Sequence, residues 1–208
     1  QLSTCSAIAY DASTDSLVGS SLDGSLTTWS SVSQAVSHVP EGPGSTTGPA
    51  GGVSRMKIPT VFPIGDQPGV LGRYFSDIAV SHGMLYGVLS PLEHSASRTL
   101  GITAFRQEQE VGAWSAVGVV DRNSTRNITC LKIVQGTDLI LTGEVLRGSK
   151  GPGSYIHGVC VYSLGSMFVR NEAELVLTEH QDVVTCVADR RTSAGVGAPL
   201  FASGSRDS

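Results

Sequence analysis

His180, Ser203 and Asp207 are the residues of this 208-residue chain whose types could together perform hydrolysis. Such a group supplies a base, a nucleophile and an acid that orients the base. The surroundings argue against this chemistry, because Ser203 lies inside a predicted strand and no Gly-x-Ser-x-Gly turn lifts a serine into an oxyanion hole. We therefore interpret the three side chains as structural hydrogen-bond partners and predict no catalytic residue, with a hydrolase as a distant alternative.

The other polar residues give no support to a phosphate, metal or acid-base site. The glycine-rich run 148–153 contains a lysine but lacks the Gly-Lys-Ser/Thr ending of a phosphate-binding loop. Glu108 and Glu110 lie at alternate positions without a partner cluster. The four cysteines show no CxxC spacing and form no zinc-type group with the five histidines. We expect neither a cofactor nor a metal.

Three cysteines, Cys5, Cys130 and Cys186, each follow a threonine inside a short apolar run. We interpret them as small buried side chains at one repeated strand position. Reduced thiols favour a cytoplasmic location. The glycosylation sequons at Asn123 and Asn127 would instead indicate secretion, but we interpret them as chance matches because no secretory signal is visible.

The overall composition excludes two classes of partner. The formal net charge is −4 and the basic residues are scattered, so a nucleic-acid surface is not expected. No apolar run approaches the roughly 18 residues that span a bilayer, so the chain should not insert into a membrane. A peripheral membrane association through the parent protein remains compatible with these features. The apolar content of 40% is enough for a substantial core.

A repeat of four short strands organises the chain. Predicted first strands lie at 3–8, 128–133 and 184–188, and second strands at 17–20, 139–142 and 200–203. Predicted third strands lie at 25–29, 100–105 and 158–162 and end on equivalent aromatic residues, Trp29, Phe105 and Tyr162. Predicted fourth strands lie at 114–120 and 173–178. Four strands per unit are typical of a β-propeller blade.

We therefore expect an all-β chain that forms part of a propeller. Its blades, about four in number, should span about 1–72, 73–122, 123–178 and 179–208, the last one incomplete. The Gly/Pro-rich segment 39–52 is predicted to be a surface loop inserted in the first blade. No segment shows a helical period. Both ends of the chain look cut, so we expect further blades in the parent protein.

The segments 180–188 and 201–207, HQDVVTCVA and FASGSRD, resemble a WD40 repeat. In that family a His before the first strand, a Ser or Thr in the second, an Asp in the next turn and a Trp in the third form hydrogen bonds across the blade. The resemblance assigns these roles in the last blade to His180, Ser203 and Asp207. In the first blade it assigns the last two roles to Asp23 and Trp29. Here Gly19 replaces the hydroxyl residue of the first blade.

The wording His-x-Asp-Val-Val-Thr-Cys, followed by Ser-Gly-Ser-Arg-Asp, is similar to a blade of the WD40 propeller in BEACH-domain, neurobeachin-like proteins. This similarity implies a non-catalytic protein–protein interaction scaffold in vesicle or membrane trafficking, with a BEACH domain upstream. A WD40 substrate receptor of a ubiquitin ligase or another complex is the alternative. A propeller hydrolase would need acidic and basic groups in the central channel, and we place none there. Candidate partner contacts lie beside the predicted hydrogen-bonded residues, at Gln181, Arg206 and Leu22.

Overall fold

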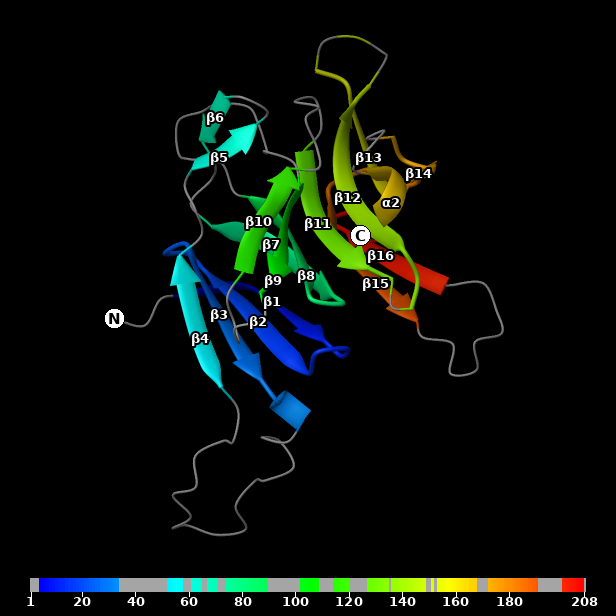
Figure 1. Cartoon of the computed structure of the whole chain (residues 1–208). Helices are drawn as coiled ribbons and strands as arrows, with labels where there is room; N and C mark the ends of the chain where they lie inside the picture. The colour runs from blue at the N-terminus through cyan, green and yellow to red at the C-terminus, as the bar shows by residue number, and fades with distance from the viewer. Residues whose placement is uncertain are drawn as a thin grey trace.

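The structure is a computed structural model, and it describes residues 4–33, 52–57, 61–64, 67–70, 74–89, 102–108, 114–119, 127–134, 136–148, 151, 153–167, 172–190 and 200–207. Within these ranges the chain forms antiparallel sheets, a short helix α2 (Leu164–Met167), and helical residues at Val32 and Ser33 after the first three strands (Figure 1). The prediction of an all-β fold built from part of a propeller is confirmed. No helix in these ranges has the length and apolar character needed to cross a membrane.

Three sheets have four strands each, and a fourth sheet has two. Sheet 1 contains β1 (Cys5–Asp11), β2 (Ser16–Ser21), β3 (Ser25–Ser30) and β4 (Val53–Lys57). Sheet 2 contains β7 (Phe75–Ser81), β8 (Met84–Leu89), β9 (Ile102–Gln107) and β10 (Trp114–Val119). Sheet 3 contains β11 (Asn127–Ile133), β12 (Leu139–Arg147), β13 (Tyr155–Ser163) and β14 (Leu175–Leu177). Sheet 4 contains β15 (Val184–Arg190) and β16 (Leu200–Ser205), and a separate hairpin contains β5 (Val61–Ile64) and β6 (Gln67–Val70).

Strands predicted from the sequence appear in all four sheets, with β9 and β10 as the predicted strands of sheet 2, while β4, β7, β8 and the hairpin β5–β6 were not predicted. Apart from Gly52, the segment 39–52 predicted as a loop lies outside the described residues, as does the sequon residue Asn123. Asn127 is the exposed first residue of β11. The strands β7 and β8 were missed although each contains an apolar run and the turn at His82-Gly83 joins them.

The first strand of every sheet contains a β-bulge at the same place. The bulge interrupts the pairing with the second strand between Cys5 and Ala7, and equivalent interruptions occur in β7, β11 and β15. The extra residue of each bulge is small and carries a hydroxyl: Ser6, Ser76, Thr129 and Thr185. Because a bulge fixes the local register, it defines which residues of the four sheets are equivalent.

The bulges show that the predicted equivalence of three cysteines is wrong for Cys5. Cys130 and Cys186 directly follow their bulges, whereas Cys5 precedes its own bulge and Ala7 takes the equivalent position. Burial differs as well, since Cys130 is buried while Cys5 and Cys186 are exposed. The shared Thr-Cys pair is thus a local coincidence in the first strand, because register depends on the bulge and on the buried face of the sheet.

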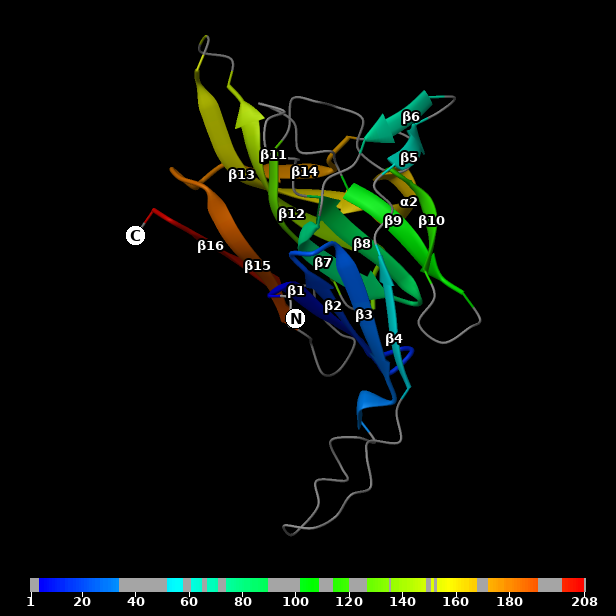
Figure 2. The same ribbon diagram turned by 90° about the vertical axis from the view of Figure 1, so that its left-hand side faces the viewer.

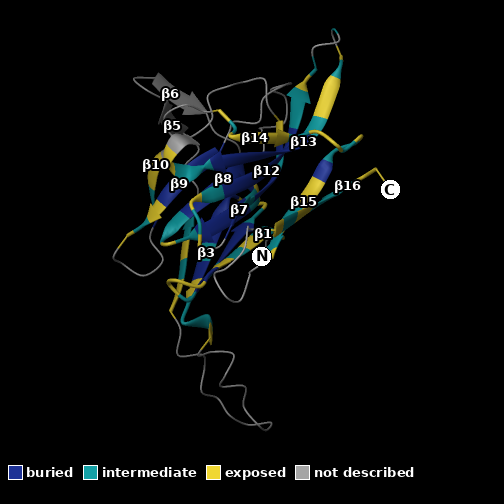
Figure 3. Ribbon diagram, turned by 90° about the vertical axis from the view of Figure 1, so that its right-hand side faces the viewer, coloured by how far each residue is buried: buried dark blue, intermediate teal, exposed yellow. Residues whose placement is uncertain are grey.

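The sheets pack face to face and bury their apolar residues between neighbours. Val18 and Leu26 of sheet 1 lie in one cluster with Phe75 and Phe105 of sheet 2, whose rings meet edge to face at a centroid distance of 5.7 Å. A second cluster joins sheets 2 and 3, and two smaller clusters join sheets 3 and 4. Figure 3 shows this buried zone across the inner strands. Each sheet is therefore stabilised mainly by its neighbours.

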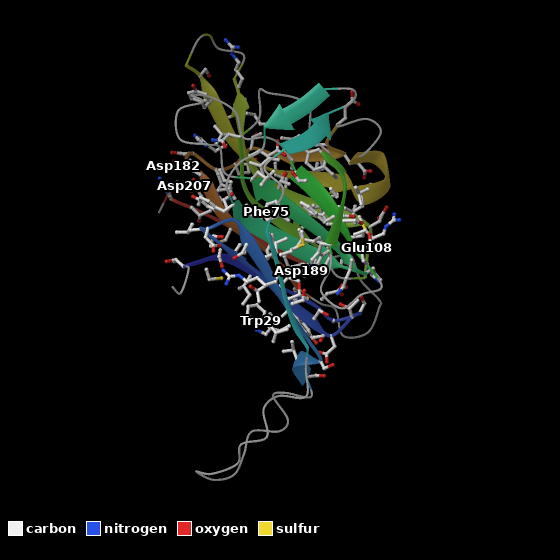
Figure 4. The ribbon with its side chains drawn as sticks, turned by 60° about the vertical axis from the view of Figure 1, so that its left-hand side comes forward. Trp29, Phe75, Glu108, Asp182, Asp189 and Asp207 are labelled. Carbon is white, nitrogen blue, oxygen red and sulfur yellow. The ribbon has the colours of Figure 1, made fainter. Side chains whose placement is uncertain are left out.

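Sheet 1 exposes a face whose counterpart in sheet 2 is buried. Register places Tyr10 and Trp29 at the positions of Val80 and Phe105, which are buried against sheet 1. Tyr10 and Trp29 themselves are 44% and 36% exposed, and Figure 4 shows Trp29 in the lower part of the molecule. The exposed face of sheet 1 thus has the apolar character of a face that packs against another sheet.

Candidate functional site

The structure brings His180, Ser203 and Asp207 together in sheet 4. His180 lies in the connection before β15, Ser203 lies within β16, and Asp207 follows β16. His180 Nε2 is 2.7 Å from Ser203 Oγ, and its Nδ1 is 3.4 Å from Asp207 Oδ1. The imidazole therefore bridges the second strand and the turn that follows it.

The carboxylate of Asp207 also joins two backbone segments. Its Oδ2 accepts a hydrogen bond of 2.7 Å from the backbone N–H of Gln181. The hydroxyl of Ser205 and then this N–H lower the pKa of Asp207, against a smaller opposing effect of burial. Hydrogen bonds to the charged form keep the group ionised. Asp207 is thus a carboxylate that ties the turn after β16 to the start of β15, where Asp182 also lies (Figure 4).

The geometry of these three residues fits a brace between strands better than a hydrolytic site. Ser203 pairs with Val187 inside the ladder of β15 and β16, so it does not stand on a sharp turn. A Cβ atom on the next residue, Gly204, would lie 2.8 Å from Cys186 Sγ, so the backbone lies close against β15. That contact lies on the opposite face of the strand from Ser203, so the argument against hydrolysis rests on the position of Ser203 inside the ladder.

In sheet 1, Asp23 and Trp29 have separate partners. Asp23 Oδ1 accepts hydrogen bonds from the Ser25 N–H at 3.0 Å and the Ser25 hydroxyl at 2.6 Å, and its Oδ2 lies 3.0 Å from Arg55 Nη2. The Trp29 ring instead lies against Gly19, where an added Cβ would be 3.1 Å from the ring. Gly19 thus provides the space that the indole fills.

Sheet 3 contains a hydrogen-bonded group that the sequence analysis missed. Glu144 is 1% exposed, and its Oε1 accepts hydrogen bonds of 2.6 Å from both Thr142 and Tyr162. Thr142 occupies the position of Ser203, since each pairs with the residue that follows the Cys of the first strand. The signal in the sequence was a glutamate in the apolar run LILTGEVL, two residues after a threonine.

The first strands of all four sheets line a cavity of about 770 Å³. Asp77, Lys132 and Asp189 lie on this cavity, so the structure contains acidic and basic groups at the channel that could not be placed there from the sequence. Lys132 Nζ is 3.8 Å from Asp189 Oδ1, and Figure 4 shows Asp189 near the middle of the molecule. The sequence analysis had no signal for this grouping, because the three residues come from three different sheets.

The polar side chains on the cavity make contacts with other groups of the protein. Asp77 Oδ2 accepts a 2.8 Å hydrogen bond from the Leu131 N–H of the neighbouring sheet. Burial raises the pKa of Asp77, while the Leu131 and Ile78 N–H groups and Lys132 oppose the rise. Burial also raises the pKa of the Cys130 thiol to about 11, so this cysteine is not a ready nucleophile. Among the described residues, no group of three or more His, Cys, Asp or Glu side chains could hold a metal ion.

The three predicted partner contacts lie at one end of the sheets. The N–H of Leu22 donates to Thr4 O at 2.9 Å, and the N–H of Arg206 donates to Val183 O at 3.2 Å, so the two residues are equivalent. Leu22 is 46% exposed, and the side chains of Arg206 and Gln181 are exposed as well. We call this end the loop face. The long hairpin β12–β13, which the sequence analysis did not single out, turns at the same end (Figure 1).

Comparisons with known proteins show similarity in fold alone. No protein-family model matches the chain, and no curated protein matches its sequence. A crystal structure of Sqt1 from Saccharomyces cerevisiae has a TM-score of 0.50 and 10% identity over 97% of this chain. A structure of U3-55K has a TM-score of 0.47 and 14% identity over 90% of this chain. The chain spans 42% of the first structure and 43% of the second, less than half of each.

The likeness to Sqt1, a WD40-repeat protein, agrees with the topology found here. The four sheets are antiparallel, their first strands surround one cavity, and each sheet packs on the next. This arrangement is that of blades in a propeller. By its fold, the chain is part of a β-propeller like that of the WD40-repeat protein Sqt1.

Proposed function

We propose that this chain is a non-catalytic protein–protein interaction scaffold. One observation carries the proposal. The side chains that could act as an acid, a base or a nucleophile already make hydrogen bonds or ion pairs to other groups of the protein. His180, Ser203 and Asp207 contact one another, and Asp77 accepts hydrogen bonds from backbone N–H groups. Function in a rigid β-scaffold then falls to the exposed side chains of its loops.

The loop face is the surface that we assign to partners. It presents an aliphatic side chain at Leu22, an amide at Gln181 and a guanidinium at Arg206. A mixture of apolar, polar and Arg side chains is typical of protein interfaces. The chain-wide net charge of −4 makes nucleic acid a poor partner for the same surface.

The proposed setting is vesicle or membrane trafficking, in the cytoplasm and peripheral to membranes. It rests on the amino-acid sequence of residues 180–186 and 203–207, which is similar to a blade of BEACH-domain proteins. The structure adds that this segment forms β15, β16 and the loop-face residues around them. The parent protein should then contain a BEACH domain and further blades.

Proximity labelling in cells tests this function. The triple variant Leu22→Ser, Gln181→Ala, Arg206→Glu should lose the proteins labelled by the unaltered chain. The control is Ala12→Glu, because Ala12 is exposed in the β1–β2 turn at the opposite end of sheet 1. We expect trafficking proteins among the lost partners. Loss of ubiquitin-ligase subunits would favour the alternative receptor function, and identical labelling of all three chains would contradict the assignment of the loop face.

A further inference from the structure

The hairpin β12–β13 extends beyond the rest of its sheet. Each of its strands has nine residues, and their pairing runs without a break from Leu139–Ser163 to Arg147–Tyr155. The neighbour β11 reaches only Val145 of β12, and β14 reaches only Val159 of β13. Figures 1 and 2 show the hairpin rising above the sheet. The outer part of this hairpin therefore has strand geometry without flanking strands among the described residues.

Among the described residues, the outer edge of β13 is open before Val159, because β14 ends at Leu177, which pairs with Val159. A Cβ atom on Gly158 would lie 2.6 Å from Leu177 O, so the end of β14 contacts the β13 backbone closely at this point. After Leu177 the chain leaves the sheet and leads to His180 and β15. Within the described ranges, no strand pairs with the outer edge of Tyr155–His157.

The direction of the backbone groups on this edge follows from the pairing. At the end of the hairpin the Gly148 N–H donates to Ser154 O at 2.7 Å, so residue 154 faces β12. Alternation along an antiparallel strand then turns the N–H and C=O groups of Tyr155 and His157 away from β12. The hydrogen bond of 2.8 Å from the Glu174 N–H to Val161 O has the same outward direction. Tyr155 and His157 thus continue the row of groups that pairs with β14.

The side chains around this edge are aromatic, aliphatic and basic. Tyr155 is 64% exposed and Ile156 is 37% exposed, and Figure 3 shows the exposed part of β13. Arg147 pairs with Tyr155 across the hairpin and is exposed, so both side chains lie on one face. Glu144 and Arg147 lie three residues apart on β12, so their side chains leave opposite faces of the strand. A strand beside Tyr155 would therefore meet a positive charge.

We propose that the outer edge of β13 at Tyr155–His157 binds an extended segment of a partner protein as an added strand, with an acidic side chain near Tyr155 and Arg147. Such β-augmentation takes its affinity from backbone hydrogen bonds and its selectivity from flanking side chains. The inference deepens the scaffold function proposed above and rests on it. The acidic extended segment is the partner class that these residues fit.

The test uses two blocked six-residue peptides of alternating threonine and valine, one with a central glutamate and one with a central lysine. Binding to the 208-residue protein is measured by fluorescence anisotropy. We expect the glutamate peptide to bind about 3- to 5-fold more tightly than the lysine peptide, and Arg147→Glu to reverse this order. No binding of the glutamate peptide up to about 1 mM would overturn the proposal.

A matched pair of variants separates backbone pairing from side-chain contact. His157→Pro removes an N–H that faces outward, whereas His157→Ala removes the side chain and keeps the N–H. The proline variant should bind the glutamate peptide at least about 10-fold more weakly than the alanine variant. Equal binding by the two would overturn the proposal.

If the proline variant does not fold, a peptide N-methylated at the amides that face β13 makes the same test on the unaltered protein, and unchanged affinity then overturns the proposal. Self-association of the chain that His157→Pro abolishes would show a second copy as the occupant and would equally overturn it. In the proximity-labelling experiment, the loop-face triple variant could lose its partners while His157→Pro keeps them. That result would overturn the added-strand inference and leave the proposed scaffold function intact. Peptide binding without loop-face partners would instead overturn the proposed assignment of the loop face.

Discussion

Replacing His180 with alanine distinguishes a structural brace from a catalytic base. The change removes the imidazole that lies 2.7 Å from Ser203 Oγ and 3.4 Å from Asp207 Oδ1. The His180 side chain is 22% exposed, so water can partly replace the lost contact at Ser203. We therefore expect a loss of about 1 kcal/mol in the free energy of unfolding, near the lower end for an unsatisfied group. In a chain of this size that is a fall of about 2–4 °C in Tm.

Chemical denaturation measures this loss, and a parallel assay for ester hydrolysis and fluorophosphonate labelling measures any activity of Ser203. A double-mutant cycle with Ser203→Ala gives the coupling between the two side chains. The control is His82→Asn, because His82 is exposed, its Nδ1 lies 2.8 Å from the neighbouring Ser81 hydroxyl, and Asn tolerates the positive φ of 51° at this position. The control should change stability much less than His180→Ala.

Acid should remove part of the same stabilisation. Hydrogen bonds from the Ser205 hydroxyl and the Gln181 N–H hold the pKa of Asp207 below its value in the unfolded chain. The stabilisation is therefore present above the unfolded pKa and is lost as the pH falls through the folded pKa. The unaltered protein and Asp207→Asn should differ in stability at neutral pH and converge in acid.

One result would refute the structural reasoning for His180. If His180→Ala abolished serine labelling or ester hydrolysis and left the free energy of unfolding unchanged, the three residues would be a catalytic group. A measurable coupling between His180 and Ser203 in stability, with no activity in the unaltered chain, would support the brace.

Two further substitutions test the buried contacts. Tyr162→Phe removes the hydroxyl that donates to the buried Glu144 at 2.6 Å and should cost about 1.5–3 kcal/mol in chemical denaturation, whereas Tyr10→Phe, which loses an exposed hydrogen bond, should cost much less. Equal losses would contradict the assigned role of the buried group. Gly143→Ala would place a Cβ 2.7 Å from Cys130 Sγ and should lower stability by about 1–3 kcal/mol, and an unchanged Tm would show that the neighbouring side chains can move aside.

The sequence predicted the third strands and their aromatic residues well. Trp29, Phe105 and Tyr162 occupy one register position, opposite Leu17, Leu85 and Ile140 of the second strands. This success has a physical cause, since a large aromatic side chain is accommodated only where the sheet offers space on one face. The strand β13 was predicted over 158–162, and its outer part was missed because Tyr155 and Ile156 lie next to a glycine-rich run that indicates a loop.

The register of the first strands could not be predicted from the local amino-acid sequence. Cys5 shares a threonine neighbour with the other two cysteines, yet it lies two positions away in register because the bulge residue is Ser6. A bulge adds one residue to a strand without altering its apolar pattern elsewhere. The channel pair Lys132 and Asp189 was missed for a related reason, because contacts between sheets depend on tertiary packing.

One position of the second strand shows how the sheets solve the same packing problem with different chemistry. In each sheet this position pairs with the second residue after the bulge, and it is occupied by Gly19, Gly87, Thr142 and Ser203. Where it is glycine, an aromatic ring from the same sheet lies against it, Trp29 in sheet 1 and Phe75 in sheet 2. Where it is a hydroxyl residue, the hydroxyl lies within hydrogen-bond distance of Glu144 in sheet 3 or His180 in sheet 4.

A glycine that receives a ring and a hydroxyl that meets a polar partner both leave the position filled and without an unpaired polar group. The fold therefore constrains the space and the hydrogen bonding at this position, while the residue type can vary. A Ser-His-Asp group found at such a position is weak evidence for catalysis, because the three other sheets of the same chain fill it without any histidine. The evidence for function lies instead in features that packing does not require, and the open edge of β13 beside Arg147 is such a feature.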